Sequence, residues 1–220
     1  MLCLAETFEL QHKLASVHAF TETLGPSVSV ANLQDDYFLK AQNQQINEML
    51  DSAFNHASVA FWGFFNEGPS NHEEAYQGYK ASSDAIKARD TSRFITYASN
   101  HRPPNDKCYG VATVISYNGY PGWYDSREPE EYWNSLASDL HSGIYPCALG
   151  KPILISETGA GGIFEWKRNR TAAKWTLGYQ ADIVSRDVAT AIKNVNISGI
   201  ALWHFFGTYK RILRFERSKC

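Results

Sequence analysis

The chain has few cysteines, no long apolar run and no internal repeat. Its four cysteines are too widely spaced for a zinc knuckle, a C-x-x-C redox pair or a dense disulfide framework. No stretch reaches the roughly 18 apolar residues that a membrane-spanning helix requires, and the first residues lack the basic start and apolar block of a signal peptide. No linker rich in Pro, Gly or Ser divides the chain, so we treat residues 1–220 as a single unit.

An excess of charge of either sign is also missing. Lys and Arg together number 21, and Asp and Glu number 23, which gives a formal net charge of −2. No basic run is longer than the Lys167-Arg168 step, so we expect no nucleic-acid partner. His72 lies beside the Glu73-Glu74 pair, but such a grouping is typical of a solvated helix face, and we assign no metal site.

Short apolar runs alternate with segments of helical periodicity. Strands are predicted over 59–65, 94–98, 111–117, 152–156 and 199–206, because each run is almost entirely apolar. Helices are predicted over 170–195, around 132–140, after a cap at Asp35 and over 72–88. A further strand is predicted at 2–6 and a loop at 21–33. This order predicts a parallel α/β fold.

The helix over 170–195 has the clearest apolar periodicity. Its predicted buried stripe consists of residues three or four apart, namely Leu177, Ala181, Val184, Val188, Ala191 and Val195. Such a stripe is expected to pack against the sheet.

Two of the apolar runs end in glutamates. The first reads W-G-F-F-N-E and ends at Glu67, and the fourth reads I-L-I-S-E and ends at Glu157. Because the carboxyl ends of parallel strands meet at one rim, we expect both carboxylates there. Hydrolysis of an acetal needs one carboxyl group to protonate the leaving oxygen and a second to stabilise or trap the oxocarbenium-like centre. A lone glutamate after a strand is more often a surface cap, but the pair favours catalysis.

Amide and aromatic side chains follow the same runs. Asn66 precedes the first glutamate and can donate its amide to a sugar hydroxyl. The third run continues into Asn118, Tyr120 and Tyr124. The two tyrosine rings can stack on sugar faces or can form part of a buried cluster under a loop. Trp203, near the end of the last run, is either the floor of a sugar pocket or part of the core.

Together these segments resemble glycoside hydrolase family 2. The motifs that carry the resemblance are W-G-F-F-N-E at 62–67, N-G-Y-P-G-W-Y at 118–124, K-P-I-L-I-S-E-T-G-A at 151–160, and the tryptophan at 203. They extend over about residues 35–206, in the order that the family has them. The resemblance implies a partial TIM (β/α)8 barrel, roughly strands three to eight, from the catalytic domain of a β-galactosidase-like or β-glucuronidase-like enzyme.

The resemblance also implies roles for single residues. Glu67 would be the general acid/base and Glu157 the nucleophile of a retaining exo-β-glycosidase that hydrolyses terminal β-galactosides or β-glucuronides. Substrate contacts fall to five further residues, Asn66 at the sugar 2-hydroxyl, Tyr120 beside the nucleophile, Asn118, Tyr124 and, beside the glycone, Trp203. The mechanism places the two carboxyl groups about 5 to 5.5 Å apart and needs no cofactor. The ligands of the magnesium and sodium ions that some members use are not matched here, so we assign no metal.

The sequence departs from the family at both ends. Sugar-binding-like and immunoglobulin-like domains normally precede the barrel, and neither is found here. With 2–6 as the third strand, strands one and two would be missing, and residues 207–220 match no family segment. We therefore expect an incomplete barrel whose open edges favour self-association.

Two alternatives remain beside a retaining exo-glycosidase. A truncated, non-catalytic homologue would bind carbohydrate or a partner through its aromatic surface, without turnover. A related barrel enzyme, such as a cellulase or mannanase, would cleave internal bonds of a polysaccharide.

Overall fold

Six parallel strands form one sheet in the computed structural model, which describes residues 19–23, 28–166 and 172–203. The strands neighbour one another in chain order: β1 (Ala19–Thr23), β2 (Val59–Asn66), β3 (Phe94–Ser99), β4 (Ile115–Asn118), β5 (Ile153–Thr158) and β6 (Ile197–Leu202). Consecutive parallel strands need a crossover connection, and here most crossovers contain a helix. The expected α/β fold and partial barrel are confirmed.

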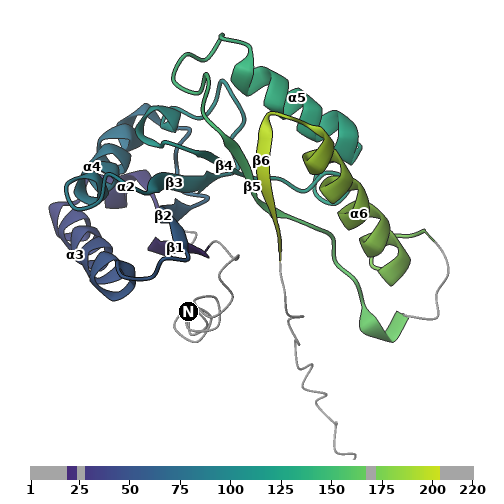
Figure 1. The fold of residues 1–220 in the computed structure, drawn as a ribbon. Helices are drawn as coiled ribbons and strands as arrows, with labels where there is room; N and C mark the ends of the chain where they lie inside the picture. Colours follow the sequence, from purple (N-terminus) through teal and green to yellow (C-terminus); the bar gives the residue numbers. More distant parts are fainter. Residues whose placement is uncertain (1–18, 24–27, 167–171, 204–220) are drawn as a thin grey trace, which may run out of the picture.

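The helices lie around the outer side of the curved sheet (Figure 1). The α-helices are α2 (Val30–Leu33), α3 (Asp36–Ala53), α4 (Tyr76–Lys87), α5 (Pro129–His141) and α6 (Leu177–Lys193). Short 3-10 turns are η1 (Glu73–Ala75), η2 (Tyr109–Val111) and η3 (Phe164–Trp166). Within the described residues, no helix combines the length and the apolar character needed to cross a membrane.

One helix begins at its predicted cap, whereas α6 begins at Leu177, later than the predicted 170. Asp35 accepts the Phe38 backbone N–H at 2.7 Å and so starts α3, as expected. Thr176 accepts the Tyr179 N–H at 3.2 Å and starts α6. α5 has Pro129 in its first turn, where the missing N–H needs no partner.

The region predicted as a loop at 21–33 is partly regular. It contains the end of β1 and the whole of α2, for which Ser29 is the cap in a capping box with Asn32. Serine and asparagine are typical of loops as well as caps, which explains the wrong prediction. The strand predicted at 2–6 lies outside the described residues.

The third predicted strand is also shorter than expected. Only Ile115–Asn118 is extended, because residues 109–111 form η2. Val111, Ala112 and Val114 are apolar and buried, but they lie in an irregular approach to the strand. The last predicted strand ends at Leu202, and its positions 204–206 lie outside the described residues.

The buried face of α6 differs from the predicted stripe. Ala181 is exposed, and Val195, which follows the helix, is 96% exposed. The buried residues of α6 are Ile183, Asp187, Thr190 and Ala191. Of the predicted stripe, Ala191 is buried and Leu177, Val184 and Val188 are half-buried, so the stripe is displaced from the buried face rather than opposite to it. A search for apolar periodicity alone leaves out the polar members of that face, Asp187 and Thr190, which are hydrogen-bonded.

Candidate active site

β2 changes its register just before the first glutamate. Gly63 pairs with Thr96 of β3 and Asn66 pairs with Ala98, so three steps on β2 face two on β3. This is a β-bulge, and Phe65 within it has a φ of 55°, a left-handed conformation that is rare for a non-glycine residue. Phe65 is buried in the core, and Asn66 makes its side-chain contacts in the candidate site.

β5 bulges in the corresponding place. Tyr117 of β4 pairs with Ile155, and the next residue, Asn118, pairs with Glu157, so Ser156 is the extra residue. Strict alternation would place Ser156 and Glu157 on opposite faces of the sheet. The bulge instead lets both contact groups of the candidate site, Ser156 through Asn118 and Glu157 through Tyr120.

A chain of amide hydrogen bonds connects the two glutamates. The Asn118 side-chain amide donates to Glu67 Oε1 at 3.0 Å and to Asn66 Oδ1 at 2.8 Å. The Asn66 amide in turn donates to Glu157 Oε1 at 3.2 Å. Ser156 Oγ donates to Asn118 Oδ1 at 2.7 Å, which fixes the orientation of the Asn118 amide. Both carboxylates are thereby held in one network.

Tyr120 holds the other oxygen of Glu157. Its hydroxyl donates to Glu157 Oε2 at 2.7 Å. Burial raises the pKa of Glu157; the Tyr120 hydrogen bond opposes this change, and the negative charge of Glu67 adds to it. The pKa of Tyr120 is also raised, by burial first and then by its bond to Glu157. Glu67 and Glu157 therefore interact electrostatically as well as through the amide network.

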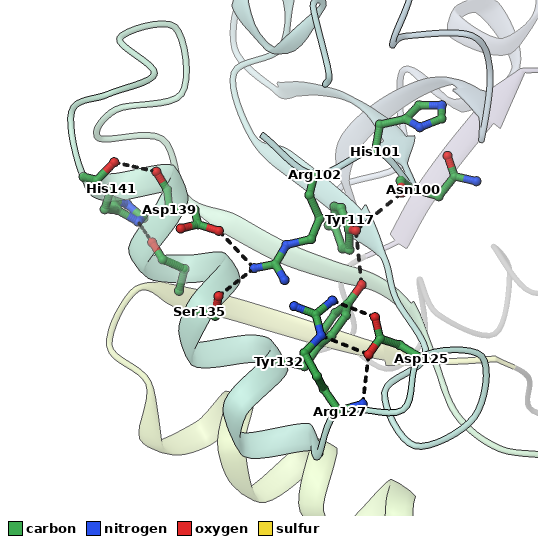
Figure 2. A network of polar contacts seen from close by, with 12 residues as sticks. Asn100, His101, Arg102, Tyr117, Asp125, Arg127, Tyr132, Ser135, Asp139 and His141 are labelled. Carbon is green, nitrogen blue, oxygen red and sulfur yellow. Dashed lines mark hydrogen bonds and ion pairs between the residues drawn. The ribbon is translucent and has the colours of Figure 1, made fainter. Parts of the chain in front are cut away.

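The segment that carries Tyr120 is supported by the network in Figure 2. The hydroxyls of Tyr117 and Tyr132 lie 3.1 Å apart, which ties β4 to α5. The guanidinium groups of Arg102 and Arg127 lie over the Tyr132 ring, 5.1 and 4.5 Å from its centroid. Arg127 also pairs with Asp125 through two hydrogen bonds of 2.9 and 2.6 Å. These contacts hold the β4–α5 connection in place.

The segment after Glu67 is anchored by a buried carboxylate that the sequence did not indicate. Asp106 accepts hydrogen bonds from Ser70 Oγ at 2.6 Å, Ser99 Oγ at 2.6 Å and Tyr97 Oη at 2.7 Å. Burial raises its pKa, and the hydrogen bonds oppose this rise. Glu67 itself has a φ of 51°, so its backbone conformation depends on such surroundings.

Some of the predicted site residues are joined by hydrogen bonds, and others lie further from this group. Hydrogen bonds join Glu67, Glu157, Asn66, Asn118 and Tyr120. Tyr124 is 81% exposed, and its ring packs edge-on against the Tyr120 ring at a centroid distance of 5.2 Å.

Trp203 lies beside the end of β5. Its backbone N–H donates to the Thr158 carbonyl at 2.8 Å, and its side chain is 60% exposed, which excludes a place in the core. Ser156 and Asp106 were not predicted as site residues, because Ser156 is predicted only as part of the strand before Glu157 and Asp106 lies in no motif. Among the described residues, no group of three or more His, Cys, Asp or Glu side chains is arranged to hold a metal ion.

Solved structures with this fold include glycosidases. Over 86% of this chain and 33% of its own, a β-galacturonidase of family GH2 from Eisenbergiella tayi, bound to galacturonate, is similar with a TM-score of 0.78 and 30% identity. A β-D-glucuronidase from Dictyoglomus thermophilum is similar with a TM-score of 0.69 and 26% identity, over 82% of this chain and 31% of its own.

Curated relatives are also glucuronidases by name. The β-glucuronidase of Bacteroides fragilis is 32% identical over 89 residues, 40% of this chain and 12% of that protein. Human β-glucuronidase is 29% identical over 140 residues, 63% of this chain and 21% of that protein. The chain thus spans well under a third of the length of the curated relatives it matches. The family model for the TIM barrel domain of glycosyl hydrolases family 2 matches residues 3–215, and the chain belongs to this family.

Proposed function

We propose that this chain forms the catalytic part of a retaining exo-β-glycosidase, with Glu157 as the nucleophile and Glu67 as the general acid/base. The observation that carries the proposal is the hydrogen-bonded series Glu67, Asn118, Asn66 and Glu157 at the ends of parallel strands β2, β4 and β5 of one sheet. Two carboxyl groups in one network, on the face where barrel enzymes hold their substrates, meet the needs of acetal hydrolysis.

The surroundings of Glu157 suit a nucleophile. Tyr120 and Asn66 each donate to a different oxygen of Glu157, and both bonds favour the ionised carboxylate against the effect of burial. In the first step, a Glu157 oxygen bonds to the sugar C1 as the bond from C1 to the leaving oxygen breaks. Glu67 gives its proton to that leaving oxygen.

The second step reverses the role of Glu67. As a carboxylate, it takes a proton from a water molecule whose oxygen bonds to C1, and the bond between Glu157 and C1 breaks. The Asn118 amide, which donates to Glu67 Oε1 at 3.0 Å, leaves the second oxygen of Glu67 for the leaving group and the water. The configuration at C1 is retained because it is inverted twice.

The glycone is proposed to be a β-linked hexuronic acid. The relatives support this choice, since those with the greatest similarity reported above are named β-glucuronidases and a β-galacturonidase. A neutral β-galactoside is the alternative glycone. Aryl β-glucuronides, β-galacturonides and β-galactosides, compared at equal concentration, distinguish the three.

The two glutamates are tested separately with azide. Glu67→Ala is expected to hydrolyse aryl glycosides slowly and to be rescued by azide with a β-glycosyl azide as product. Glu157→Ala with azide should give the α-glycosyl azide, because a single displacement inverts C1. Glu74→Gln, a change of an exposed glutamate in η1, is the matched control and should retain wild-type turnover.

Two outcomes contradict the proposal. Wild-type turnover in either alanine variant would remove that glutamate from the mechanism. Saturable sugar binding by folded wild-type chain, with no hydrolysis of any of the three glycosides, would favour the non-catalytic carbohydrate-binding interpretation.

A further inference from the structure

A fully buried carboxyl group lies behind the strand that carries Glu157. Asp187 of α6 is 0% exposed, and its two oxygens accept hydrogen bonds from two different elements. Trp133 Nε1 of α5 donates to Oδ1 at 2.7 Å, and Thr158 Oγ1 of β5 donates to Oδ2 at 2.8 Å. Trp133 and Thr158 are themselves 0% exposed. Asp187 therefore joins α5, α6 and β5 within the layer between the sheet and the helices.

Thr158 directly follows Glu157 in the bulged part of β5. The two side chains have different surroundings, as alternation along a strand requires, because Glu157 contacts the site and Thr158 contacts the helix layer. The backbone is held on both sides here, since Gly119 N–H donates to the Glu157 carbonyl at 2.9 Å and Trp203 N–H to the Thr158 carbonyl at 2.8 Å. The bond from Thr158 to Asp187 is the side-chain attachment of this segment to the helices.

The environment of Asp187 is unusual for a structural carboxylate. Burial raises its pKa to about 6, although the bonds from Trp133 and Thr158 oppose the rise. The charge of Glu130 adds to the rise, and that of Arg186 opposes it. Both hydrogen-bond donors are neutral, so an ionised Asp187 remains in the protein interior without a salt bridge of its own among the described residues.

Asp90, which contacts Trp62 of β2, is a second buried aspartate, and its charge is balanced in a different way. It also accepts an indole N–H, from Trp62 at 2.8 Å, and it is 4% exposed. Asp90, however, forms a salt bridge with Arg93 at 2.8 Å. Burial raises the pKa of Asp90, but the bonds from Ser92, Trp62 and Arg93 outweigh burial and leave it below the ordinary value. The charge of a buried aspartate in this fold can thus be balanced by a salt bridge, as for Asp90, whereas Asp187 forms none among the described residues.

We propose that Asp187 is a positioning residue that fixes the β5 bulge through the Thr158 hydroxyl and so holds Glu157 against Tyr120 and Asn66. The proposal rests on the proposed role of Glu157 and adds a pH dependence to it. The ionised Asp187 accepts two charge-assisted hydrogen bonds, and protonation removes the charge that strengthens both of them. Glu157 is therefore held most firmly above about pH 6.

The test measures the titration of Glu157 directly. The full chain is labelled with 13C at the glutamate side-chain carboxyls, and Glu157→Gln identifies the Glu157 resonance. Thr158→Val removes the hydroxyl and keeps the shape of the side chain. The expected result is a rise of the Glu157 midpoint by about half a pH unit or more, because the bonds from Tyr120 and Asn66 weaken when the bulge relaxes.

A matched control separates positioning from general destabilisation. Thr96 of β3 is also 0% exposed, and its hydroxyl lies within hydrogen-bond distance of Ser116 Oγ, at 2.7 Å, and of the Val114 carbonyl oxygen, at 2.9 Å. Thr96→Val removes a comparable hydroxyl from another strand and should leave the Glu157 midpoint where it is. Thr158→Ser restores a hydroxyl at the tested position and should return the midpoint toward the wild-type value.

Asp187→Asn provides a second variant if Thr158→Val does not fold. In the wild-type chain, the Glu157 resonance should show a second inflection near pH 6, and this inflection should be missing in Asp187→Asn. With an active chain, Thr158→Val should also lower kcat on an aryl glycoside by about tenfold or more, with little change in KM.

The outcomes separate this proposal from the proposed function. An unchanged Glu157 midpoint in folded Thr158→Val, or an equal shift in Thr96→Val, overturns the positioning role whether or not the chain has activity. If Glu157 responds as expected but the wild-type chain hydrolyses no glycoside, the positioning role holds and the catalytic proposal fails.

Discussion

Asp187 makes the stability of this protein depend on pH in an unusual direction. Its pKa is about 6 in the folded chain against 3.8 for the free side chain, so the folded state binds the proton more tightly than the unfolded state. Between these two values the folded state carries more protons, and stability must fall as pH rises. The difference is about 2 pH units, which corresponds to about 3 kcal/mol of unfolding free energy for this fully buried group.

Asp187→Asn removes this contribution because an amide does not titrate. The variant loses hydrogen bonds, so its unfolding free energy can be lower than that of the wild type at acidic pH. Between pH 4 and pH 7, however, the difference between variant and wild type should move by about 2 kcal/mol in favour of the variant, since the unfolded aspartate is already largely ionised at pH 4. Contributions from groups that both proteins share cancel in this difference.

Urea unfolding followed by tryptophan fluorescence at pH 4, 5, 6 and 7 measures the effect. Asp90→Asn is the control, because the pKa of Asp90 is lowered in the folded state and its pH-dependent contribution is complete above the unfolded value of 3.8. Its difference from the wild type should therefore stay nearly constant over the same range. A constant difference for Asp187→Asn as well would refute the reasoning.

Three further substitutions test contacts of the site. Tyr120→Phe removes a hydrogen-bond donor from Glu157, so the pKa of Glu157 should rise further. The acidic limb of the kcat/KM profile on an aryl glycoside should then move to higher pH, and an unmoved limb contradicts this. Asn118→Ala breaks the link between Glu67 and Asn66 and should lower kcat by about 10- to 100-fold, while circular dichroism shows an unchanged fold. Asp106→Asn leaves buried donors without an acceptor and should lower the urea-derived unfolding free energy by about 2 kcal/mol, and a change near zero would argue against the anchor.

The strand ends could be predicted from the sequence because they combine two local signals. An uninterrupted apolar run predicts a strand covered on both faces, and a polar residue directly after it marks the rim. Glu67, Glu157, Asn66 and Asn118 were all predicted in this way, and the structure joins them by hydrogen bonds. Their catalytic roles stay predictions.

The residues that support the site could not be predicted from the sequence, and the reason is physical. Asp187 and Asp106 gain their importance from partners far along the chain, such as Thr158, 29 positions away, and Ser70, 36 positions away. An apolar pattern counts such aspartates as solvent-facing, so it left Asp187 out of the predicted stripe of α6 and included the exposed Ala181. The register shifts in β2 and β5 could not be predicted either, because the pairing between strands is decided by the whole sheet.

The paired bulges in β2 and β5 also have a consequence for how such a site can be gained or lost. In each strand a single extra residue brings a polar side chain from the helix side to the substrate side, while the apolar residues before it keep their places in the core. Removal of Ser156 would restore simple alternation and place the glutamate where Ser156 now lies, still on the side of the site but without the hydroxyl that orients the Asn118 amide. Insertion of one residue into a barrel strand is therefore a way to add a second polar side chain to this face while the apolar residues before it keep their positions.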